Sequence, residues 1–548
     1  MESQGSPLDP DSSNSAPLDP ASGRGAIFLL CAVALAGSGT MVVELSAVHL
    51  MAPWFGSTNA VWTNAIGVIL LALALGYSLG ARWSRNEKPS VHLVQVLVLA
   101  ATWVALLPWI NGPVAGWFMP SGVTLDGAVS LLFWGSLACS VVLFLPPAWM
   151  LGCVAPLAVE LLARGEHDRA GHAGGHVLAV STVGSLAGTF ATTYWLIPSL
   201  GLRFTFALAA FALVLAATLI ALPRGSRTPL GMWLIVPLLA GFAPDASPAT
   251  PGELKLLAQV QSPYQFLRVV EDGQGRRLVV NEALDSFQSV WRDKPGLIGP
   301  GHYYDYFVPP VHWDPRPEPW RLLTLGLGAG TAVRVLEGSL PEGQRLLSTG
   351  VEIDPQIVGL GELYFDLEVG TSTRTVYSGL DARAAMRQLP KDFDQIILDA
   401  YANNMEVPAH LCSVEFFREV RDHLRDGGWF TVNVAGFGLQ DVLVDAVTRT
   451  VASAFEGDVL LVRVPFSRNC MIYARKGEAP LGPEDAGFLV GADDLRQRLQ
   501  SLRMPGAARW VKASGPVPLT DNYNPILSLQ RESVELGLNA LMQGDGGN

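Results

Sequence analysis

Residues 320–330 read WRLLTLGLGAG, an apolar run that ends in a glycine-rich turn, and this stretch decides the fold. TAVRVLEGSL follows at 331–340 with the spacing of an amphipathic helix. Strand-like runs that precede further helical patterns recur downstream: LLSTGVEIDP at 346–355, TRTVYSGL at 373–380, FDQIILDAY at 393–401 and WFTVNVAGFG at 429–438. Alternating strands and helices predict a parallel, doubly wound α/β sheet.

Chemically distinctive residues follow these predicted strands, at the sheet edge where ligands bind. The glycines after the first strand let a ligand approach the backbone closely. Glu352 closes the second strand about 22 residues later, where a carboxylate accepts both hydroxyls of a ribose. Asp381 follows the third strand as a candidate for binding an adenine edge, and Asp399 ends the fourth. GLGAG lacks the second half of the dinucleotide fingerprint, which favours a single adenosyl nucleoside over NAD. The glycines are Gly326, Gly328 and Gly330.

A different pattern precedes the α/β region. YQFLRVVED and RRLVVNEA alternate around a DGQG turn within residues 255–315, which is a hairpin signal. The sequence therefore predicts a small β subdomain before the larger sheet. Asp354, in EIDP, is interpreted as a turn or helix cap rather than a ligand.

The first half of the chain has the composition of a membrane domain. The 548 residues carry a net charge of −12, which is the wrong sign for gripping phosphates and excludes nucleic acid as a partner. Charged residues make up only 16% of the chain, and residues 1–250 hold nine of its 37 Lys and Arg. Residues 1–24 are rich in Ser, Pro, Asp and Gly and predict a disordered leader.

About 20 apolar residues span a bilayer, and six such stretches are predicted. A seventh, at 229–243, is short and contains two prolines, so it is interpreted as an interfacial segment, with a full seventh span as the alternative. Basic residues follow the second, fourth and sixth spans, whereas 51–61 and 111–126 contain none. This asymmetry places the N-terminus in the cytoplasm, and six spans leave the second half there too. The predicted spans are 26–50, 62–82, 91–110, 127–158, 174–199 and 203–223.

Polar residues lie inside two of these spans. Glu44 is costly in hydrocarbon and is a functional candidate, and His49 lies about one turn further along the same span. The fifth span is rich in Ser and Thr. These residues indicate either a polar path between helices or interhelical hydrogen bonds that hold the bundle together.

Several of these motifs together resemble the spermidine synthase (polyamine aminopropyltransferase) family, in its bacterial form fused to an N-terminal multi-pass membrane domain. The motifs are SPYQFLRVVED, LGLGAGTAVRVL, VEIDP, SGLDARAAM, FDQIILDAYANNMEVPAHLCSVEFFREV and LTDNYNP. VVELSAVHLMAPWFGST and ALGYSLGARWS resemble the first two helices of such fusions. The resemblance implies an α-helical transmembrane bundle, a small β subdomain and a Rossmann-like, methyltransferase-type domain.

The resemblance also implies a reaction and roles for single residues. The donor of the family is decarboxylated S-adenosylmethionine, the acceptor is a diamine, and the enzymes are often homodimers. Gln265 would contact the donor, Glu352 would hold its ribose and Asp381 its adenine. Asp399 would orient the amine and act as general base. Tyr303 and Tyr304 fall where the family has an aromatic residue and a polar neighbour close to the substrate.

The chain departs from the family at two positions that are usually acidic. Ala329 stands where an Asp of the glycine loop would grip the amine of the donor, and Ala402 stands three residues after Asp399 where a second Asp is usual. Each lost charge-assisted contact would cost about 1.5–3 kcal/mol. Glu406 and Asp305 are candidates for supplying a replacement carboxylate.

Three functions are compatible with these observations. The first is a membrane-bound, aminopropyltransferase-like enzyme that releases methylthioadenosine. The second is another S-adenosylmethionine-using enzyme, either a methyltransferase or one that cleaves or cyclises the sulfonium. The third is a transporter or sensor whose soluble domain binds a nucleoside or polyamine. No metal site is predicted, and the expected location is the inner (plasma) membrane with a cytoplasmic catalytic domain.

The predicted organisation has five parts. They are a leader at 1–24, a transmembrane domain at 25–250, a β subdomain at 251–318, a spermidine-synthase-type domain at 319–535 and a disordered tail at 536–548.

Overall fold

The computed structural model divides the chain into two compact units, which are described separately. The first runs from the N-terminus to Ser247 apart from two short loops, and the second contains Pro248–Asn548. Residues 1–22 of the leader predicted at 1–24 lie outside the described residues, as do Ala402 and Glu406, whereas residues 23 and 24 already belong to a helix. The described residues are 23–55, 59–86, 88–119, 125–163, 170–221, 230–243, 254–280, 288–316, 318–401, 407–513 and 518–544.

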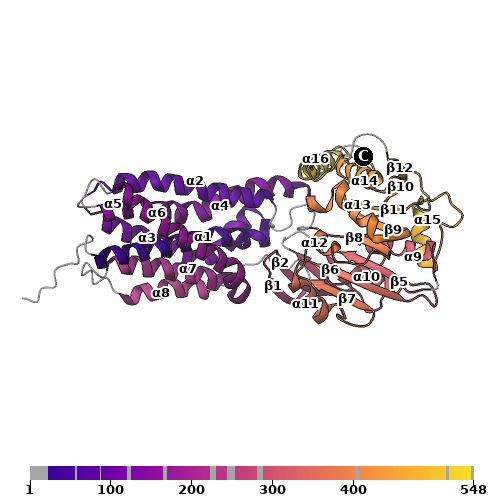
Figure 1. Cartoon of the computed structure of the whole chain (residues 1–548), viewed down its shortest axis with the longest axis horizontal. Coiled ribbons are helices and arrows are strands. Elements are labelled where there is room, and N and C mark those ends of the chain that lie inside the picture. The colour runs from indigo at the N-terminus through magenta and orange to yellow at the C-terminus, as the bar shows by residue number, and fades with distance from the viewer. Residues whose placement is uncertain are drawn as a thin grey trace, which may run out of the picture. The chain divides into compact units, whose positions relative to one another are not determined.

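The first unit is a bundle of long apolar helices (Figure 1). Among the described residues, five helical segments are long and apolar enough to cross a membrane. The fifth, Gly171–Ala221, has 51 residues and contains predicted span five and residues 203–221 of predicted span six. Gly201 has a φ of 73° and breaks this segment. The elements are α1 (Gly23–Phe55), α2 (Asn59–Trp83), α3 (Pro89–Phe118), α4 (Leu125–Gly152), α5 (Val154–Ala163), α6 (Ala170–Ala191), the π-helical turn η2 (Thr192–Leu196), α7 (Ile197–Ala221) and α8 (Leu230–Gly241).

Small residues let α1 and α6 pack closely. A Cβ atom added at Gly184 would lie 2.1 Å from the carbonyl oxygen of Ala34, and one at Gly188 would lie 2.6 Å from that of Ser38. Ser185 Oγ donates to the carbonyl oxygen of Gly37 across the same contact, at 3.2 Å. Ser185 therefore makes an interhelical hydrogen bond, as the second interpretation of the fifth span predicts.

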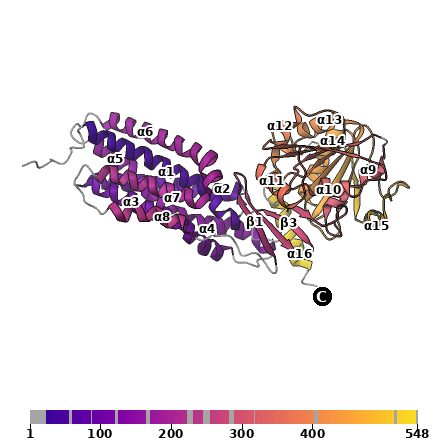
Figure 2. The ribbon, with the colours of Figure 1, turned by 90° about the horizontal axis from the view of Figure 1, so that it is seen from below.

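Helix α8 is hydrogen-bonded to residues of α3 and α7, and its interpretation as an interfacial segment or as a full seventh span stays a prediction. Trp109 Nε1 donates to the Leu239 carbonyl at 2.5 Å, and Arg203 Nη1 donates to the Ala243 carbonyl at 2.7 Å. Figures 1 and 2 show α8 beside α7. Trp109 lies 20 residues along α3 from Pro89, or about 30 Å of helix. The end of α8 therefore lies at the opposite end of the bundle from the turn between α2 and α3.

The second unit contains the predicted small sheet and the predicted large sheet. The small sheet is antiparallel, in the order β1-β2-β3-β4, and the large one has the order β12-β10-β11-β9-β8-β5-β6-β7. The strands are β1 (Lys255–Gln261), β2 (Phe266–Asp272), β3 (Gly275–Val280), β4 (Ser289–Trp291), β5 (Trp320–Leu325), β6 (Leu346–Glu352), β7 (Arg374–Ser378), β8 (Phe393–Leu398), β9 (Leu424–Ala435), β10 (Val459–Arg463), β11 (Asn469–Arg475) and β12 (Ala508–Val511).

The predicted parallel sheet corresponds to strands β5 to β9. Strand β5 pairs in parallel with both β6 and β8, so the strand order reverses between β5 and β8. Such a switch point opens a crevice at the carboxyl ends of the strands. Strands β10, β11 and β12 extend the sheet in antiparallel fashion beyond β9.

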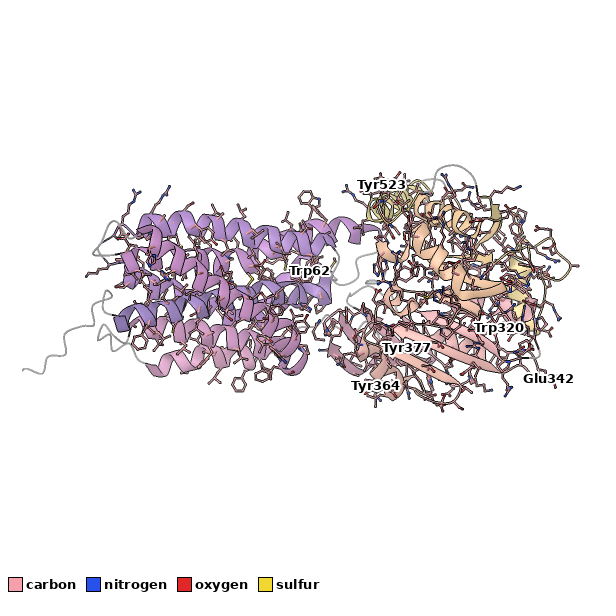
Figure 3. The ribbon with its side chains drawn as sticks, viewed as in Figure 1. Trp62, Trp320, Glu342, Tyr364, Tyr377 and Tyr523 are labelled. Atoms are coloured by element: carbon pink, nitrogen blue, oxygen red, sulfur yellow. The ribbon has the colours of Figure 1, made fainter. Side chains whose placement is uncertain are left out.

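Helices cover both faces of the large sheet, and each face has its own apolar core. Helices α12 (Ala382–Met386), α13 (Val414–His423) and α14 (Val442–Phe455) pack on one face. Helix α10 (Thr331–Glu337), the 3-10 turn η4 (Tyr303–Phe307), α9 (Pro309–Trp313) and α15 (Asp493–Ser501) cover the other. Trp320, labelled in Figure 3, is fully buried at the start of β5 and donates to Gln395 Oε1 at 3.2 Å.

Two further helices complete the second unit. Helix α11 (Pro355–Tyr364) packs against the small sheet through Ile357 and Leu360. Helix α16 (Ile526–Gly544) continues past residue 536, where the sequence predicts a disordered tail.

Candidate active site

The glycine loop brings the ends of two strands unusually close together. Gly326 follows β5 with a φ of 83°, and a Cβ atom there would lie 2.4 Å from the Asp399 carbonyl oxygen. The N–H groups of Gly326 and Leu327 both donate to the Val351 carbonyl at 3.0 Å. Only glycine fits both the left-handed backbone and this approach. The loop therefore places the ends of β5, β6 and β8 around one crevice.

Glu352 lies at the end of β6 and is held by backbone donors. The Gly328 N–H donates to its Oε2 at 2.9 Å, and the Asp354 N–H donates to its Oε1 at 3.1 Å. The side chain is buried. Burial raises the pKa of Glu352 to about 7, although both hydrogen bonds oppose this rise. The first predicted donor-binding carboxylate thus contacts the predicted glycine loop directly.

Asp381 lies at the start of α12 and caps that helix. Its Oδ1 accepts from the N–H groups of Arg383 and Ala384 at 3.0 and 3.1 Å. His410 Nε2 lies 2.8 Å from its Oδ2. The hydrogen bond from His410 is the main reason why the pKa of Asp381 is lowered. The predicted role of Asp381 in binding adenine stays a prediction, and His410 is a neighbour that the sequence did not indicate.

Tyr264 adds an aromatic side chain to this end of the crevice. Its pKa is raised by burial and by the negative charges of Asp354, Asp381 and Glu352. The tyrosine is nevertheless 45% exposed, so its ring borders both solvent and the carboxylates. Sequence analysis missed Tyr264, although it stands within the SPYQF motif.

The neighbouring Gln265 has a different environment. Gln265 is buried, and its backbone N–H donates to Ser262 Oγ at 2.9 Å. Its side chain and that of Ser262 help to lower the pKa of Asp354, which burial raises. Asp354 accepts from the Gln356 N–H and caps α11, which confirms its interpretation as a cap. Contact of Gln265 with a donor stays a prediction.

Asp399 follows β8 at the switch point, and both its oxygens accept hydrogen bonds from side chains. Tyr303 Oη donates to Oδ2 at 3.1 Å, and Asn433 Nδ2 donates to Oδ1 at 2.9 Å. Burial raises the pKa of Asp399 to about 6, and these two donors oppose the rise. A carboxylate with this pKa is mostly ionised at neutral pH and still takes up a proton readily. Asn433, on β9, is a further residue that sequence analysis missed.

The two predicted tyrosines have different positions. Tyr303 faces Asp399, while Tyr304 stacks behind it with ring centroids 4.2 Å apart. Tyr304 Oη donates to the Gln288 carbonyl instead of to Asp399. Burial raises the pKa of both hydroxyls, so both stay protonated and can donate.

Of the two predicted replacement carboxylates, only Asp305 lies within the described residues. Asp305 is fully buried, accepts from the Ile298 and Gly299 N–H groups and pairs with Arg498 at 2.5 Å. These contacts turn it away from Asp399, so the prediction for Asp305 is wrong. Glu406, like Ala402, lies outside the described residues.

Ala329 is buried under the small sheet. It is 1% exposed and belongs to an apolar cluster with Leu267, Val269 and Ile357. Its N–H donates to Ser289 Oγ at 2.9 Å. The glycine loop thus presents a methyl group, packed against apolar side chains, where an acidic residue is usual in the family.

The membrane candidates lie in the first unit. His49 Nδ1 lies 3.0 Å from the Leu45 carbonyl of its own helix, and its ring makes an edge contact with the ring of Trp62. Trp62 is labelled in Figure 3. Glu44 lies one turn earlier on α1 and is partly buried. A role for either residue stays a prediction. Within the described residues, no group of three His, Cys, Asp or Glu side chains is arranged to hold a metal ion.

Comparison with known proteins finds polyamine aminopropyltransferases. No family model matches the chain. The chain is similar over 306 residues to a probable polyamine aminopropyl transferase of Bifidobacterium longum, with 31% identity across 53% of this chain and 64% of that protein. It is similar over 459 residues to polyamine aminopropyltransferase 2 of Streptomyces coelicolor, with 28% identity across 79% and 77% of the two chains. The chain is therefore similar to the polyamine aminopropyltransferase (spermidine synthase) family.

The matches differ in how much of this chain they cover. The Streptomyces match of 459 residues is longer than Pro248–Asn548 and so includes part of the helical unit. The chain spans 64% of the Bifidobacterium protein and 48% of a polyamine aminopropyltransferase of Vibrio vulnificus, to which it is 33% identical over 153 residues. A solved structure of a probable spermidine synthase from Corynebacterium glutamicum aligns with a TM-score of 0.39 and 18% identity, over 49% of this chain and 98% of that one.

Proposed function

We propose that the chain is a membrane-bound, aminopropyltransferase-like enzyme that binds decarboxylated S-adenosylmethionine, transfers its aminopropyl group to an amine and releases methylthioadenosine. The observation that carries this proposal is Asp399, a carboxylate at the switch point whose pKa is about 6. Glu352 and the glycine loop lie beside it, at the position where an adenosyl donor would bind. Relatives named as polyamine aminopropyltransferases support the same reaction class.

The chemistry needs a base and an anchor. The lone pair of the amine attacks the carbon next to the sulfonium sulfur, so that a C–N bond forms while the C–S bond breaks. The electrons of the broken bond stay on sulfur, which becomes a neutral thioether. The amine loses one proton, which Asp399 accepts. Glu352 and the glycine loop would hold the nucleoside in line for this attack, which lowers the entropic barrier.

A second reaction class is favoured by Ala329. Its methyl group is buried among apolar side chains, so the glycine loop offers no carboxylate for the amine of an aminopropyl donor. S-adenosylmethionine itself would then compete as the donor, in methyl transfer or in cleavage of the sulfonium. The Asp399 base and the Glu352 anchor are compatible with either donor.

Product analysis distinguishes these reactions. The purified full-length protein is incubated with S-adenosylmethionine or its decarboxylated form, each with and without putrescine or spermidine, and products are followed by mass spectrometry. We expect methylthioadenosine and an elongated amine only with the decarboxylated donor. This product should disappear in Asp399→Asn and persist in Asp392→Asn, a matched change at an exposed ion pair with Arg321. Products formed from S-adenosylmethionine without an amine would overturn the aminopropyl proposal.

The helical unit also suggests the side of the membrane on which the chain continues. We propose that the bundle spans a bilayer with α8 as an additional crossing. Arg82, Arg85 and Lys88 mark the turn between α2 and α3, whereas residue 243 lies at the other end of the bundle. The loops 51–61 and 111–126, at that other end, contain no Lys or Arg. By the positive-inside rule, the chain then leaves the bundle on the non-cytoplasmic side, contrary to the expectation from six spans.

Reporter fusions test this topology in the full chain. Alkaline phosphatase fused after residue 548 should be active and green fluorescent protein there should be dark, with the opposite result for fusions after residue 85. A fluorescent fusion at residue 548 would restore the six-span topology. In sealed right-side-out vesicles, donor added outside should then support full turnover only if the non-cytoplasmic topology is correct.

A further inference from the structure

Behind Asp399, a row of polar side chains connects two neighbouring strands. Asn433 on β9 donates through Nδ2 to Asp399 Oδ1 at 2.9 Å. Asn469 at the start of β11 donates through Nδ2 to Asn433 Oδ1 at 2.8 Å. Ser467 Oγ in turn donates to Asn469 Oδ1 at 2.6 Å. Strands β9 and β11 pair in the large sheet, with Asn433 opposite Met471 and Asn469 opposite Ala435, so the two asparagines are diagonal neighbours across the pair. Ser467, Asn469 and Asn433 are called the amide relay below.

The hydrogen bonds of the amide relay can run in one direction only, from Ser467 through Asn469 and Asn433 to Asp399. An ionised carboxylate has no proton to donate, so Asn433 must present its NH₂ group to Asp399. The carbonyl oxygen of Asn433 then faces Asn469, which must donate to it. The carbonyl oxygen of Asn469 is left facing the Ser467 hydroxyl, which supplies the last proton. Each amide that accepts a hydrogen bond on its oxygen becomes a stronger donor through its nitrogen.

The backbone at Asn433 is fixed as well. Tyr401 Oη donates to the backbone carbonyl oxygen of Asn433 at 2.9 Å and accepts from the backbone N–H of Ala435 at 2.9 Å. Asn433 is itself only 4% exposed. Rotation of its side-chain amide is therefore the main freedom left at this position. The hydrogen bond from Asn469 opposes that rotation.

We propose that Asn469 is a positioning residue for the reaction, which acts on Asp399 through Asn433 by keeping the Asn433 amide turned as a donor. The proposal rests on the proposed function where turnover is concerned, because Asp399 is the base of that reaction. Oδ1 of Asp399 is committed to Asn433. Oδ2, which faces the Tyr303 hydroxyl, is then the oxygen that receives the proton from the amine.

A flip of the Asn433 amide would have a large electrostatic effect. It would point a carbonyl dipole at Asp399 in place of an N–H group. The flip would remove a charge-assisted hydrogen bond and set two oxygen atoms against each other, so the ionised form of Asp399 would become less stable. Less of the base would be ionised at neutral pH. Turnover would fall most at acidic pH and recover as the pH rises.

The test compares three single substitutions in the full-length protein by the pH dependence of kcat. Asn469→Asp preserves shape but replaces the donor with an acceptor, so the Asn433 amide should flip. We expect its acid limb, the fall of kcat at low pH, to move up by at least one pH unit, so that kcat falls about threefold or more at pH 6.5 and about tenfold or more at pH 5. Asn469→Ala, which adds no charge, should move the limb in the same direction by less. Ser467→Ala should lower kcat by less than threefold.

The KM of the donor distinguishes a positioning role of Asn469 from damage to the fold. The KM of the donor should change by less than twofold in all three variants, because the amide relay does not contact Glu352 or the glycine loop. An equal loss of kcat at every pH, with an unshifted acid limb, would show that Asn469 has only a structural role and would overturn the proposal. A larger shift in Asn469→Ala than in Asn469→Asp would overturn the argument from amide direction.

A measurement without substrate keeps the proposal testable if the reaction class is wrong. Infrared difference spectra between the wild-type protein and Asp399→Asn isolate the Asp399 carboxylate band, whose titration gives its pKa directly. Asn469→Asp should raise that pKa by at least one unit. No turnover together with this shift would refute the proposed function alone. No shift would refute the amide relay whatever the reaction.

Discussion

Glu352 and Asp399 are two buried carboxylates at the ends of strands in the same sheet, and they are held in different ways. Glu352 accepts from two backbone N–H groups, of Gly328 and Asp354. Asp399 accepts from two side chains, of Tyr303 and Asn433, which lie far from it in the chain. The proposed donor-binding end of the crevice is therefore held by backbone N–H groups. The proposed reacting end depends on side chains that only the assembled fold brings together.

The largest effects are expected from substitution of these two carboxylates, because one change should weaken donor binding and the other should slow the reaction. Glu352→Ala should weaken binding of the adenosyl donor about 100-fold, because two charge-assisted contacts to a ribose are lost. Asp399→Asn should lower kcat by about 10²- to 10⁴-fold, the usual contribution of a general base, with little change in donor affinity. Titration calorimetry and steady-state kinetics measure the two effects. Equal losses of affinity in both variants would contradict the division of roles.

Substitution of Gly326 tests whether stability depends on the close approach between the ends of β5 and β8. Gly326→Ala should lower the free energy of unfolding by about 2–4 kcal/mol, since its Cβ would lie 2.4 Å from the Asp399 carbonyl oxygen. Gly343→Ala is the matched control: its φ of 79° is similar, and no atom lies within 4 Å of its added Cβ. That control should cost only about 1–2 kcal/mol of backbone strain. If denaturant unfolding gave equal losses of unfolding free energy in the two variants, the close approach of the two strand ends would not matter for stability.

The raised pKa of Glu352 predicts how stability changes with pH. Its pKa rises from 4.5 to about 7 on folding, so between these values the folded protein binds more protons than the unfolded one. The contribution of Glu352 to the free energy of unfolding therefore falls as the pH rises through this window. The fall is on the order of 3 kcal/mol. Thermal unfolding between pH 4.5 and 7.5 should show a flatter slope in Glu352→Gln.

The control for this slope is a glutamate on the surface of the same unit. Glu342→Gln, at an exposed position labelled in Figure 3, should leave the pH slope unchanged. An unchanged slope in Glu352→Gln as well would mean that Glu352 does not titrate in this range.

The smallest predicted effect distinguishes the two stacked tyrosines. Tyr303→Phe removes the donor to Asp399 Oδ2, so the pKa of Asp399 should rise further above about 6 and the acid limb of kcat should move up with it. We expect about a tenfold loss near pH 6 and a smaller one at pH 8. Tyr304→Phe loses a bond to the Gln288 carbonyl instead and should keep the acid limb of the wild type. Indistinguishable pH profiles would contradict the placement of Tyr303.

The helical unit shows where hydropathy alone was insufficient. Composition identified its apolar stretches because long runs without charge are visible in the sequence. It did not place α8, which is short and contains Pro237. The bonds of Trp109 and Arg203 to carbonyls near the end of α8 join it to α3 and α7, and both partners are more than 35 residues away in the chain.

The sequence by itself determined the order of strands and helices, the glycine loop, Glu352 and Asp399, because strand ends and tight turns follow from short-range patterns. Tertiary structure decided the rest of the site. It turned Asp305 toward Arg498, stacked Tyr304 behind Tyr303 and brought Tyr264 to the carboxylates. It also joined Asn433 and Asn469 across two paired strands. The direction of a side chain depends on neighbours from distant segments, and no local pattern records them.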